Sequence, residues 1–130
     1  MMRAVVRYVV TLLVMLPLDA AWLTLTGGAY RQTMGSLLKP QFDLPAAIAF
    51  YMVYVFGVTV LVTLPASKPL PAAMRGAVFG FTAYATYDLT ALSVIRDWPL
   101  SLSLVDMAWG TVLTAVASCV TVWIMNRKTA

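Results

Sequence analysis

Three aspartates lie inside long apolar segments of the chain: Asp19, Asp88 and Asp106. An ionised carboxylate in hydrocarbon costs several kcal/mol, so such a residue persists only if it has a partner or a task. Buried carboxyl groups serve as cation sites, as proton carriers or as structural hydrogen-bonding centres. The three acids are therefore the centre of the candidate site.

Two of these acids occur in the same short motif, D-x-x-W. The chain reads Asp19-Ala-Ala-Trp22 and Asp106-Met-Ala-Trp109, which puts a carboxylate and an indole one turn apart on one helix face. An indole N–H only donates, so it can bond to a carboxylate on a neighbouring helix and offset its desolvation. Two interpretations stay open: a polar cavity, or interfacial tryptophan anchors beside structural acids.

Asp88 shares a helical stripe with small residues. Counting back by fours gives Tyr84, Gly80 and Gly76, and such a small-xxx-small run lets another helix approach closely. Gly110 is expected to serve the same kind of packing. Asp88 should therefore face protein and not lipid.

Tyrosines are the expected companions of the acids, because a phenol can hydrogen-bond a carboxyl group in either protonation state. Tyr84 and Tyr87 flank Asp88, while Tyr51 and Tyr54 lie on another segment at about the same depth; aromatic-belt positions are the alternative. Arg96 has two interpretations: it folds back onto the acids, or it forms a solvated pair with the adjacent Asp97 in the turn. The candidate ligand-binding residues are Asp19, Trp22, Tyr51, Tyr54, Tyr84, Tyr87, Asp88, Arg96, Asp106 and Trp109.

The chain lacks the residues that several kinds of chemistry require. The chain has no His, which removes the usual general base and the commonest transition-metal ligand, and its single Cys119 lies in an apolar segment. The spacing demands no metal site, no cofactor motif is present, and no basic patch interleaved with aromatics indicates nucleic-acid binding.

The elements that position these residues are membrane-spanning helices. With 62% hydrophobic residues and 11% charged residues, the 130-residue chain is too apolar for a soluble domain of its size. Four segments reach the length needed to cross hydrocarbon, and we expect an all-α, integral membrane four-helix bundle as one domain. The predicted spans are residues 4–26, 44–64, 72–95 and 102–125.

The charges predict the orientation, because cytoplasmic loops are enriched in Lys and Arg. One side would carry Arg3, Arg7, Lys68, Arg75, Arg127 and Lys128, and the other only Arg31, Lys39 and Arg96. Both termini should therefore be cytoplasmic. The three acids then lie at similar depth in the outer half of the bundle.

The combined pattern resembles a family of predicted bacterial inner-membrane proteins, the domain of unknown function 2177. The resemblance rests on Asp19 with Trp22, Tyr30-Arg31, Arg75-Gly76 with Gly80, Tyr84 to Thr90, Arg96 to Pro99, and Val105 to Gly110. Ala91 stands where an Asn is common in the family. The resemblance implies a multi-pass protein of the bacterial inner membrane and a link to fatty-acyl or membrane-lipid modification.

Three functions remain open on this basis. The leading hypothesis is a binding or accessory module, not an enzyme, with an outer-leaflet-facing polar pocket for a lipid or small amphiphile. Its partners would be membrane lipids and either a second copy or a membrane enzyme. The alternatives are a proton- or cation-coupled carrier acting as a dimer, and a membrane enzyme that uses an Asp as general acid or base. The absence of acids from the cytoplasmic half favours binding over transport.

Overall fold

The computed structural model describes residues 1–129, with the side chain of residue 129 left aside. The chain forms α1 (Met2–Met34), the short 3-10 helix η1 (Gly35–Leu37), α2 (Leu44–Val58), the π-helical turn η2 (Thr59–Thr63), α3 (Pro69–Val94) and α4 (Leu100–Thr129). Residues 1–129 contain no strand. The predicted all-α class is confirmed.

Three stretches are long and apolar enough to cross a membrane: Met2–Leu37, Leu44–Thr63 and Leu100–Lys128. The 26-residue α3 is outside this set, although the sequence analysis expected a span over residues 72–95. Its length, about 39 Å at 1.5 Å per residue, suffices to cross hydrocarbon. Its Arg75, its Asp88 and its Gly, Thr and Tyr residues leave it without a continuous stretch as apolar as those three.

The first helix is longer than predicted. A boundary at residue 26 was expected from Gly27-Gly28, but α1 runs through both glycines to Met34. Glycine weakens a helix without breaking it, at about 1 kcal/mol relative to Ala. The helix ends at Gly35, whose φ of 46° lies in the left-handed region that glycine adopts without a steric penalty. The other predicted boundaries agree within four residues.

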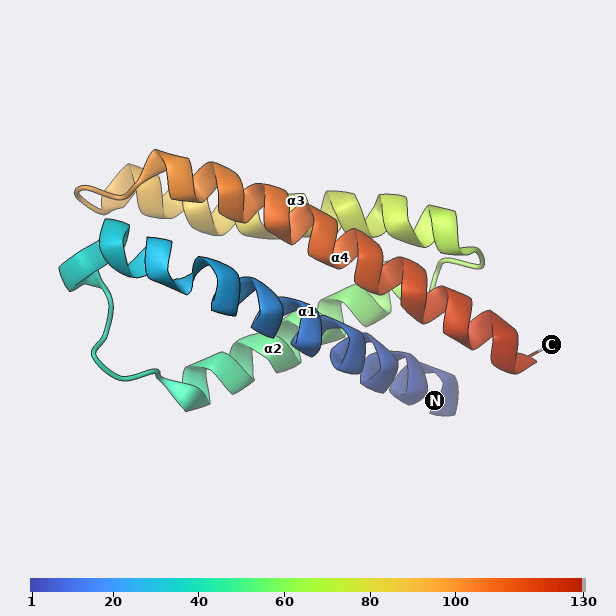
Figure 1. Cartoon of the computed structure of the whole chain (residues 1–130). Helices are drawn as coiled ribbons and strands as arrows, with labels where there is room; N and C mark the ends of the chain where they lie inside the picture. The colour runs from blue at the N-terminus through green and yellow to red at the C-terminus, as the bar shows by residue number, and fades with distance from the viewer. Residues whose placement is uncertain (130) are drawn as a thin grey trace.

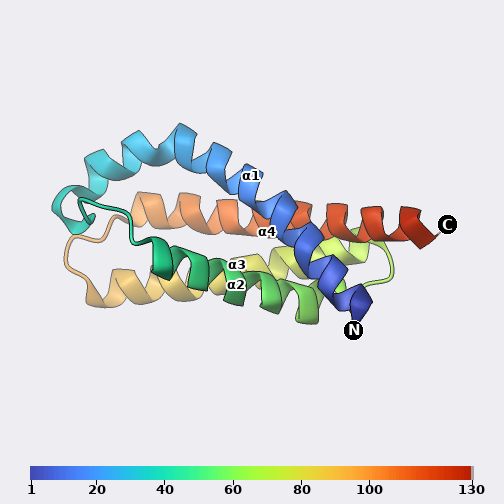
Figure 2. The same cartoon turned by 90° about the horizontal axis from the view of Figure 1, so that it is seen from below.

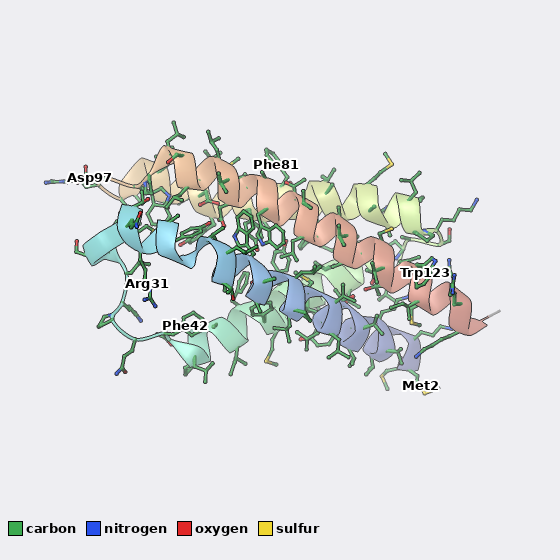
Figure 3. The ribbon with its side chains drawn as sticks, in the orientation of Figure 1. Met2, Arg31, Phe42, Phe81, Asp97 and Trp123 are labelled. Atoms are coloured by element: carbon green, nitrogen blue, oxygen red, sulfur yellow. The ribbon has the colours of Figure 1, made fainter. Side chains whose placement is uncertain are left out.

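The helices alternate in direction, and α3 and α4 lie side by side along their length (Figure 1). Both chain termini lie at one end, as the views of Figures 1 and 2 agree. Figure 3 places Arg31 and Asp97 at the opposite end from Met2 and Trp123. The acid-bearing halves of α1, α3 and α4 therefore gather at the end far from the termini.

Glycines set the close contact between α3 and α4. A Cβ added to Gly76 would lie 2.6 Å from the Thr114 carbonyl oxygen. A Cβ on Gly80 would collide with the Gly110 carbonyl, and one on Gly110 with the Tyr84 ring. This is the close backbone approach that small residues allow between membrane helices. The stripe that ends in Asp88 consequently faces α4.

The core at mid-length is apolar, and hydroxyl groups tie helices together beside it. Its buried residues are Met15, Tyr54, Val55, Val58, Val62, Leu113 and Ala117. Thr11 Oγ1 of α1 lies 3.1 Å from Thr121 Oγ1 of α4, and Tyr54 of α2 bonds to Thr114 Oγ1 of α4 at 2.7 Å. Such interhelical hydrogen bonds replace the hydrophobic driving force that lipid surroundings remove.

Helix α1 is bent over the other helices, as Figure 2 shows, and Pro17 lies inside it. Proline has no N–H to donate to the carbonyl one turn earlier, and its ring pushes that turn open. We attribute the bend to this residue. The half of α1 that follows Pro17 thereby changes direction relative to α4. The candidate site forms between this half of α1 and the adjacent parts of α3 and α4.

Helix α2 begins after a capping residue, Asp43. The Asp43 carboxylate accepts from the Ala46 N–H at 3.2 Å, and Pro45 occupies the first turn. Lys39 Nζ lies 2.7 Å from Asp43 Oδ2. The hydrogen bond from Lys39, then that from Ala46, holds the pKa of Asp43 below its usual value.

The distribution of Lys and Arg predicts that the end of the bundle at which both termini lie is cytoplasmic. We expect Ser67→Cys, in the loop between η2 and α3, to react with an impermeant maleimide only after intact cells are permeabilised. Ser36→Cys, in η1, should react without permeabilisation. Both residues are exposed, and both variants are made in a Cys119→Ala background. The reverse labelling would move the acid-bearing end to the cytoplasmic side.

The α3–α4 contact predicts that Gly80→Leu destabilises the fold by about 1–3 kcal/mol or more, because overfilling a tight contact forces the helices apart. Gly57→Leu is the matched control, since a Cβ there meets only the far end of the Phe79 ring, at 2.8 Å. The free energy of unfolding, measured by SDS titration, checks this. An equal decrease in the free energy of unfolding for both variants would contradict the tight contact between α3 and α4.

Candidate functional site

A cavity of about 300 Å³ lies between α1, α3 and α4, in the half of the bundle that is far from the chain termini. All three intramembrane aspartates line it. The other lining residues are Trp22, Leu23, Tyr30, Met34, Leu38, Tyr84, Tyr87, Trp98, Pro99, Leu102, Ser103 and Trp109. The structure thus brings seven of the ten sequence-predicted site residues to one cavity.

Asp19, on α1, is held by two neutral donors. Trp109 Nε1 of α4 donates to Asp19 Oδ1 at 3.2 Å, and the Tyr51 hydroxyl of α2 donates to Asp19 Oδ2. The second bond also brings α2 to the site, although Tyr51 does not line the cavity. Because both donors are neutral, no positive charge compensates this carboxyl group.

The two tryptophans of the D-x-x-W motifs stack face to face. The ring centroids of Trp22 and Trp109 are 4.5 Å apart and their planes differ by 3°. The stack joins α1 to α4 at the level of the acids. Trp109 therefore both donates to an acid on another helix, as the motif suggested, and stacks on the ring of Trp22.

Asp106, on α4, has a tyrosine donor and an acidic neighbour. The Tyr30 hydroxyl of α1 donates to Asp106 Oδ1 at 3.1 Å. The carboxyl group of Asp88, on α3, interacts with that of Asp106 closely enough for a hydrogen bond. Two carboxyl groups bond to each other only when one of them holds a proton. The pair can therefore exchange a proton or share a cation.

Asp88 is the most deeply buried of the three acids. Its side chain is only 2% exposed, and its Oδ2 has no hydrogen-bond partner. Buried polar atoms are nearly always satisfied, and an orphaned acceptor carries a desolvation cost of about 1–3 kcal/mol. Asp88 therefore lines the cavity with a carboxyl group of which one buried oxygen is left unengaged by the protein.

The remaining predicted tyrosines have different positions. Tyr84 is half-buried in the cavity wall, Tyr87 lines the cavity but is 62% exposed, and Tyr54 is buried in the mid-length core. Tyr87 and Trp98 meet edge to face, with centroids 5.9 Å apart. Tyr54 does not line this cavity, and its hydroxyl is engaged by Thr114.

The structure does not bring Arg96 to the acids. Both Arg96 and Arg31 are exposed, and neither lines the cavity. Between described residues a single ion pair forms, Lys39 with Asp43, outside the site. Arg96 is solvated, as the turn interpretation expected, because the turn after α3 projects beyond the helix ends (Figure 3). It does not form the expected pair with Asp97, which adopts a φ of 58° in that turn. The carboxyl groups of the site thus lack a cationic partner.

A second, larger cavity of about 630 Å³ opens beside the first, between α2 and α3. It is lined by Ala46, Phe50, Tyr54, Ala83, Tyr84, Tyr87 and Asp106. Tyr84, Tyr87 and Asp106 line both cavities. An apolar groove therefore leads from the side of the bundle to the acids.

Sequence analysis missed Tyr30, Trp98 and Ser103 as site residues. Tyr30 follows Asp19 by eleven residues, or three helical turns, which puts both on one face of α1. The expected helix end at Gly27-Gly28 concealed that relation. Trp98 Nε1 donates to Ser103 Oγ at 2.9 Å, and this bond closes the cavity at the α3–α4 turn; the short spacing of the two residues was the available signal.

The arrangement separates Asp19 from the pair formed by Asp88 and Asp106. Within residues 1–129, no three His, Cys, Asp or Glu side chains are grouped so that they can hold a metal ion together. Asp19 has both oxygens engaged by neutral donors, whereas Asp88 keeps an open acceptor. The site can therefore accept hydrogen bonds from a donor, and positive charge is what it lacks.

Comparison with known proteins gives one match. A family model described as "Predicted membrane protein (DUF2177)" matches residues 4–123, which is nearly the whole chain. This confirms the resemblance drawn from the motifs. Neither the curated proteins nor the solved structures contained a match.

The contact between Asp88 and Asp106 predicts that their substitutions couple. Replacing either by Asn removes the need to share a proton, so the second replacement should cost less than it does alone. We expect a coupling free energy of about 0.5–3 kcal/mol in a double-mutant cycle on the free energy of unfolding. Asp88→Asn with Asp97→Asn is the control pair, expected to be additive. Additivity of the Asp88 and Asp106 changes would mean that these carboxyl groups act separately.

Proposed function

We propose that this chain, which belongs to the DUF2177 family of predicted membrane proteins, is a membrane binding module whose cavity holds the polar head of a lipid or small amphiphile. One observation carries the proposal. The deeply buried Asp88 lines a cavity between membrane helices, and one of its carboxyl oxygens has no hydrogen-bond partner. A fold that only needed Asp88 as a structural pin would satisfy that oxygen within the protein.

The shape of the surroundings supports an amphiphile over a wholly polar solute. The cavity at the acids is small and places three carboxyl groups in a largely apolar lining, whereas the adjoining groove between α2 and α3 is lined mainly by Ala46, Phe50 and Ala83 with aromatic rings. Ligand sites combine an apolar lining with a few placed polar groups. A molecule with a polar end and an apolar end fits the two spaces together.

A proton- or cation-coupled carrier is the second candidate, favoured by a column of buried hydroxyl groups. Thr114, Ser118 and Thr121 follow one face of α4 away from the acids, and all three are fully buried. Ser118 Oγ has no hydrogen-bond partner. The half of the bundle near the chain termini therefore contains polar groups, although it has no acid among the described residues, and such a column can carry a proton if water joins it.

The binding proposal predicts that a discrete lipid or amphiphile remains with the purified protein and depends on Asp88. Wild type, Asp88→Asn and Asp97→Asn are purified in mild detergent, and bound small molecules are quantified per mole of protein by mass spectrometry. Asp97 is an exposed turn acid, which makes it the matched control. We expect Asp88→Asn to lose the bound species by about tenfold or more, the effect of one charged hydrogen bond.

Size-exclusion chromatography and the unfolding midpoint must show that Asp88→Asn is folded. Equal retention by folded Asp88→Asn and Asp97→Asn, or no discrete species on the wild type, would remove the proposal. The carrier candidate makes a different prediction: Ser118→Ala should abolish proton flux into vesicles while leaving the bound species unchanged.

A further inference from the structure

We infer that the ligand of this cavity carries a protonated primary amine on a single apolar chain, with the ammonium group at Asp88 and Asp106 and the chain in the groove between α2 and α3. This inference rests on the proposed binding function and specifies the chemical class of the ligand. Four observations on the described residues support it: charge, hydrogen-bond inventory, aromatic lining and shape.

The charge of the lining favours a cation. Three carboxyl groups line one cavity, and no Lys or Arg lines it with them. Bringing an anionic head to these acids would add repulsion in a medium of low dielectric constant, where charges are poorly screened. A cationic head instead supplies the partner that Arg31 and Arg96 do not provide.

The hydrogen-bond inventory favours a donor. Several of the donors around the cavity are already engaged: the Tyr30 and Tyr51 hydroxyls and the Trp109 indole bond to the acids, and the Trp98 indole bonds to Ser103. The unsatisfied buried atom of the cavity is an acceptor, Asp88 Oδ2. A primary ammonium group has three N–H donors and no acceptor, whereas a trimethylammonium group has no N–H donor.

Aromatic rings complete the surroundings of a cation. The stacked pair Trp22 and Trp109, together with Tyr84, Tyr87 and Trp98, lines the same cavity as the acids. The negative face of an aromatic ring attracts a cation, most strongly for Trp and where water is excluded. These rings offer a desolvated ammonium group compensation that hydrocarbon does not.

The volumes of the two cavities indicate where the head and the chain of the ligand lie. The cavity at the acids, about 300 Å³, is at the lower limit of ordinary ligand sites and suits a small head group. The groove of about 630 Å³ begins at Tyr84, Tyr87 and Asp106, the residues that both spaces share, and it reaches Ala46 and Phe50 on α2. A single chain can therefore run from the acids to the side of the bundle.

The test is a set of probes that share one chain and differ in the head: dodecylammonium, dodecyltrimethylammonium, dodecanol and dodecanoate. They are titrated into full-length protein in phosphatidylcholine nanodiscs, and tryptophan fluorescence is recorded. A Trp123→Phe background leaves Trp22, Trp98 and Trp109, all of which line the cavity. The half-saturating concentration of dodecylammonium should be lower than that of each other probe by about tenfold or more.

Two acid variants and one groove variant locate the ligand. Asp88→Asn and Asp106→Asn should each raise the half-saturating concentration of dodecylammonium by about tenfold or more, while Asp97→Asn leaves it unchanged. Because either site variant alone can lose its fold, each is checked by its unfolding midpoint. Ala46→Leu narrows the groove, so it should weaken dodecylammonium binding but leave ethylammonium binding unchanged.

The outcomes separate this inference from the proposed function. If dodecanol or dodecanoate saturates as readily as dodecylammonium, in a manner that depends on Asp88, the cavity binds amphiphiles but the amine assignment is wrong. If dodecyltrimethylammonium has the same half-saturating concentration as dodecylammonium, the charge of the head alone determines binding, and the argument from N–H donors fails. If no long-chain probe gives a saturable signal that the Asp88 and Asp106 variants change, the binding function and the inference fail together.

Discussion

The close contact of α3 with α4 is the constraint on which the site depends. Gly76 and Gly80 on α3, and Gly110 on α4, leave no room for a Cβ at the contact, so the two backbones meet almost directly. This approach brings the carboxyl group of Asp88 to that of Asp106. In water two carboxylates would separate at little cost, but in a lipid-facing bundle the packing of the helices holds them together.

The bend in α1 supplies the rest of the site. Pro17 precedes Asp19 by half a turn, and beyond it the helix continues through Gly27-Gly28 to present Tyr30 to Asp106. A helix that ended at the glycines would not carry Tyr30 to the cavity that Asp19 and Trp22 line. The Trp22–Trp109 stack then fixes α1 to α4 across that cavity. A helix breaker and a pair of rings thus position a polar site among apolar helices.

The polar groups of the bundle fall into two classes that serve different purposes. Pairs such as Thr11 with Thr121 and Tyr54 with Thr114 satisfy each other and hold helices together. Asp88 and Ser118 are buried with atoms left unsatisfied. The first class explains how the fold persists in lipid, and the second marks where the protein departs from what stability alone would select.

The sequence by itself determined the helical class, the apolar stretches and the facing of the Asp88 stripe. These follow from composition and from the 3.6-residue period, which assigns each residue a face and a depth. Composition and periodicity are properties of each segment by itself, so they can be read without knowing how the segments pack. The D-x-x-W spacing also allowed, as one of two interpretations, an indole that bonds to an acid of another helix, because an indole N–H only donates.

Only the tertiary structure decided which partners meet. Trp109 bonds to Asp19, whereas Asp106 receives Tyr30, and Arg96 stays exposed beyond the helix ends. These choices depend on the α3–α4 separation, the bend at Pro17 and the length of α1 past its glycines. Each of these depends on contacts between distant segments or on a local free-energy balance of about 1 kcal/mol, as for glycine inside a helix. Periodicity fixes the face of a residue, but the packing of the other helices fixes what that face meets.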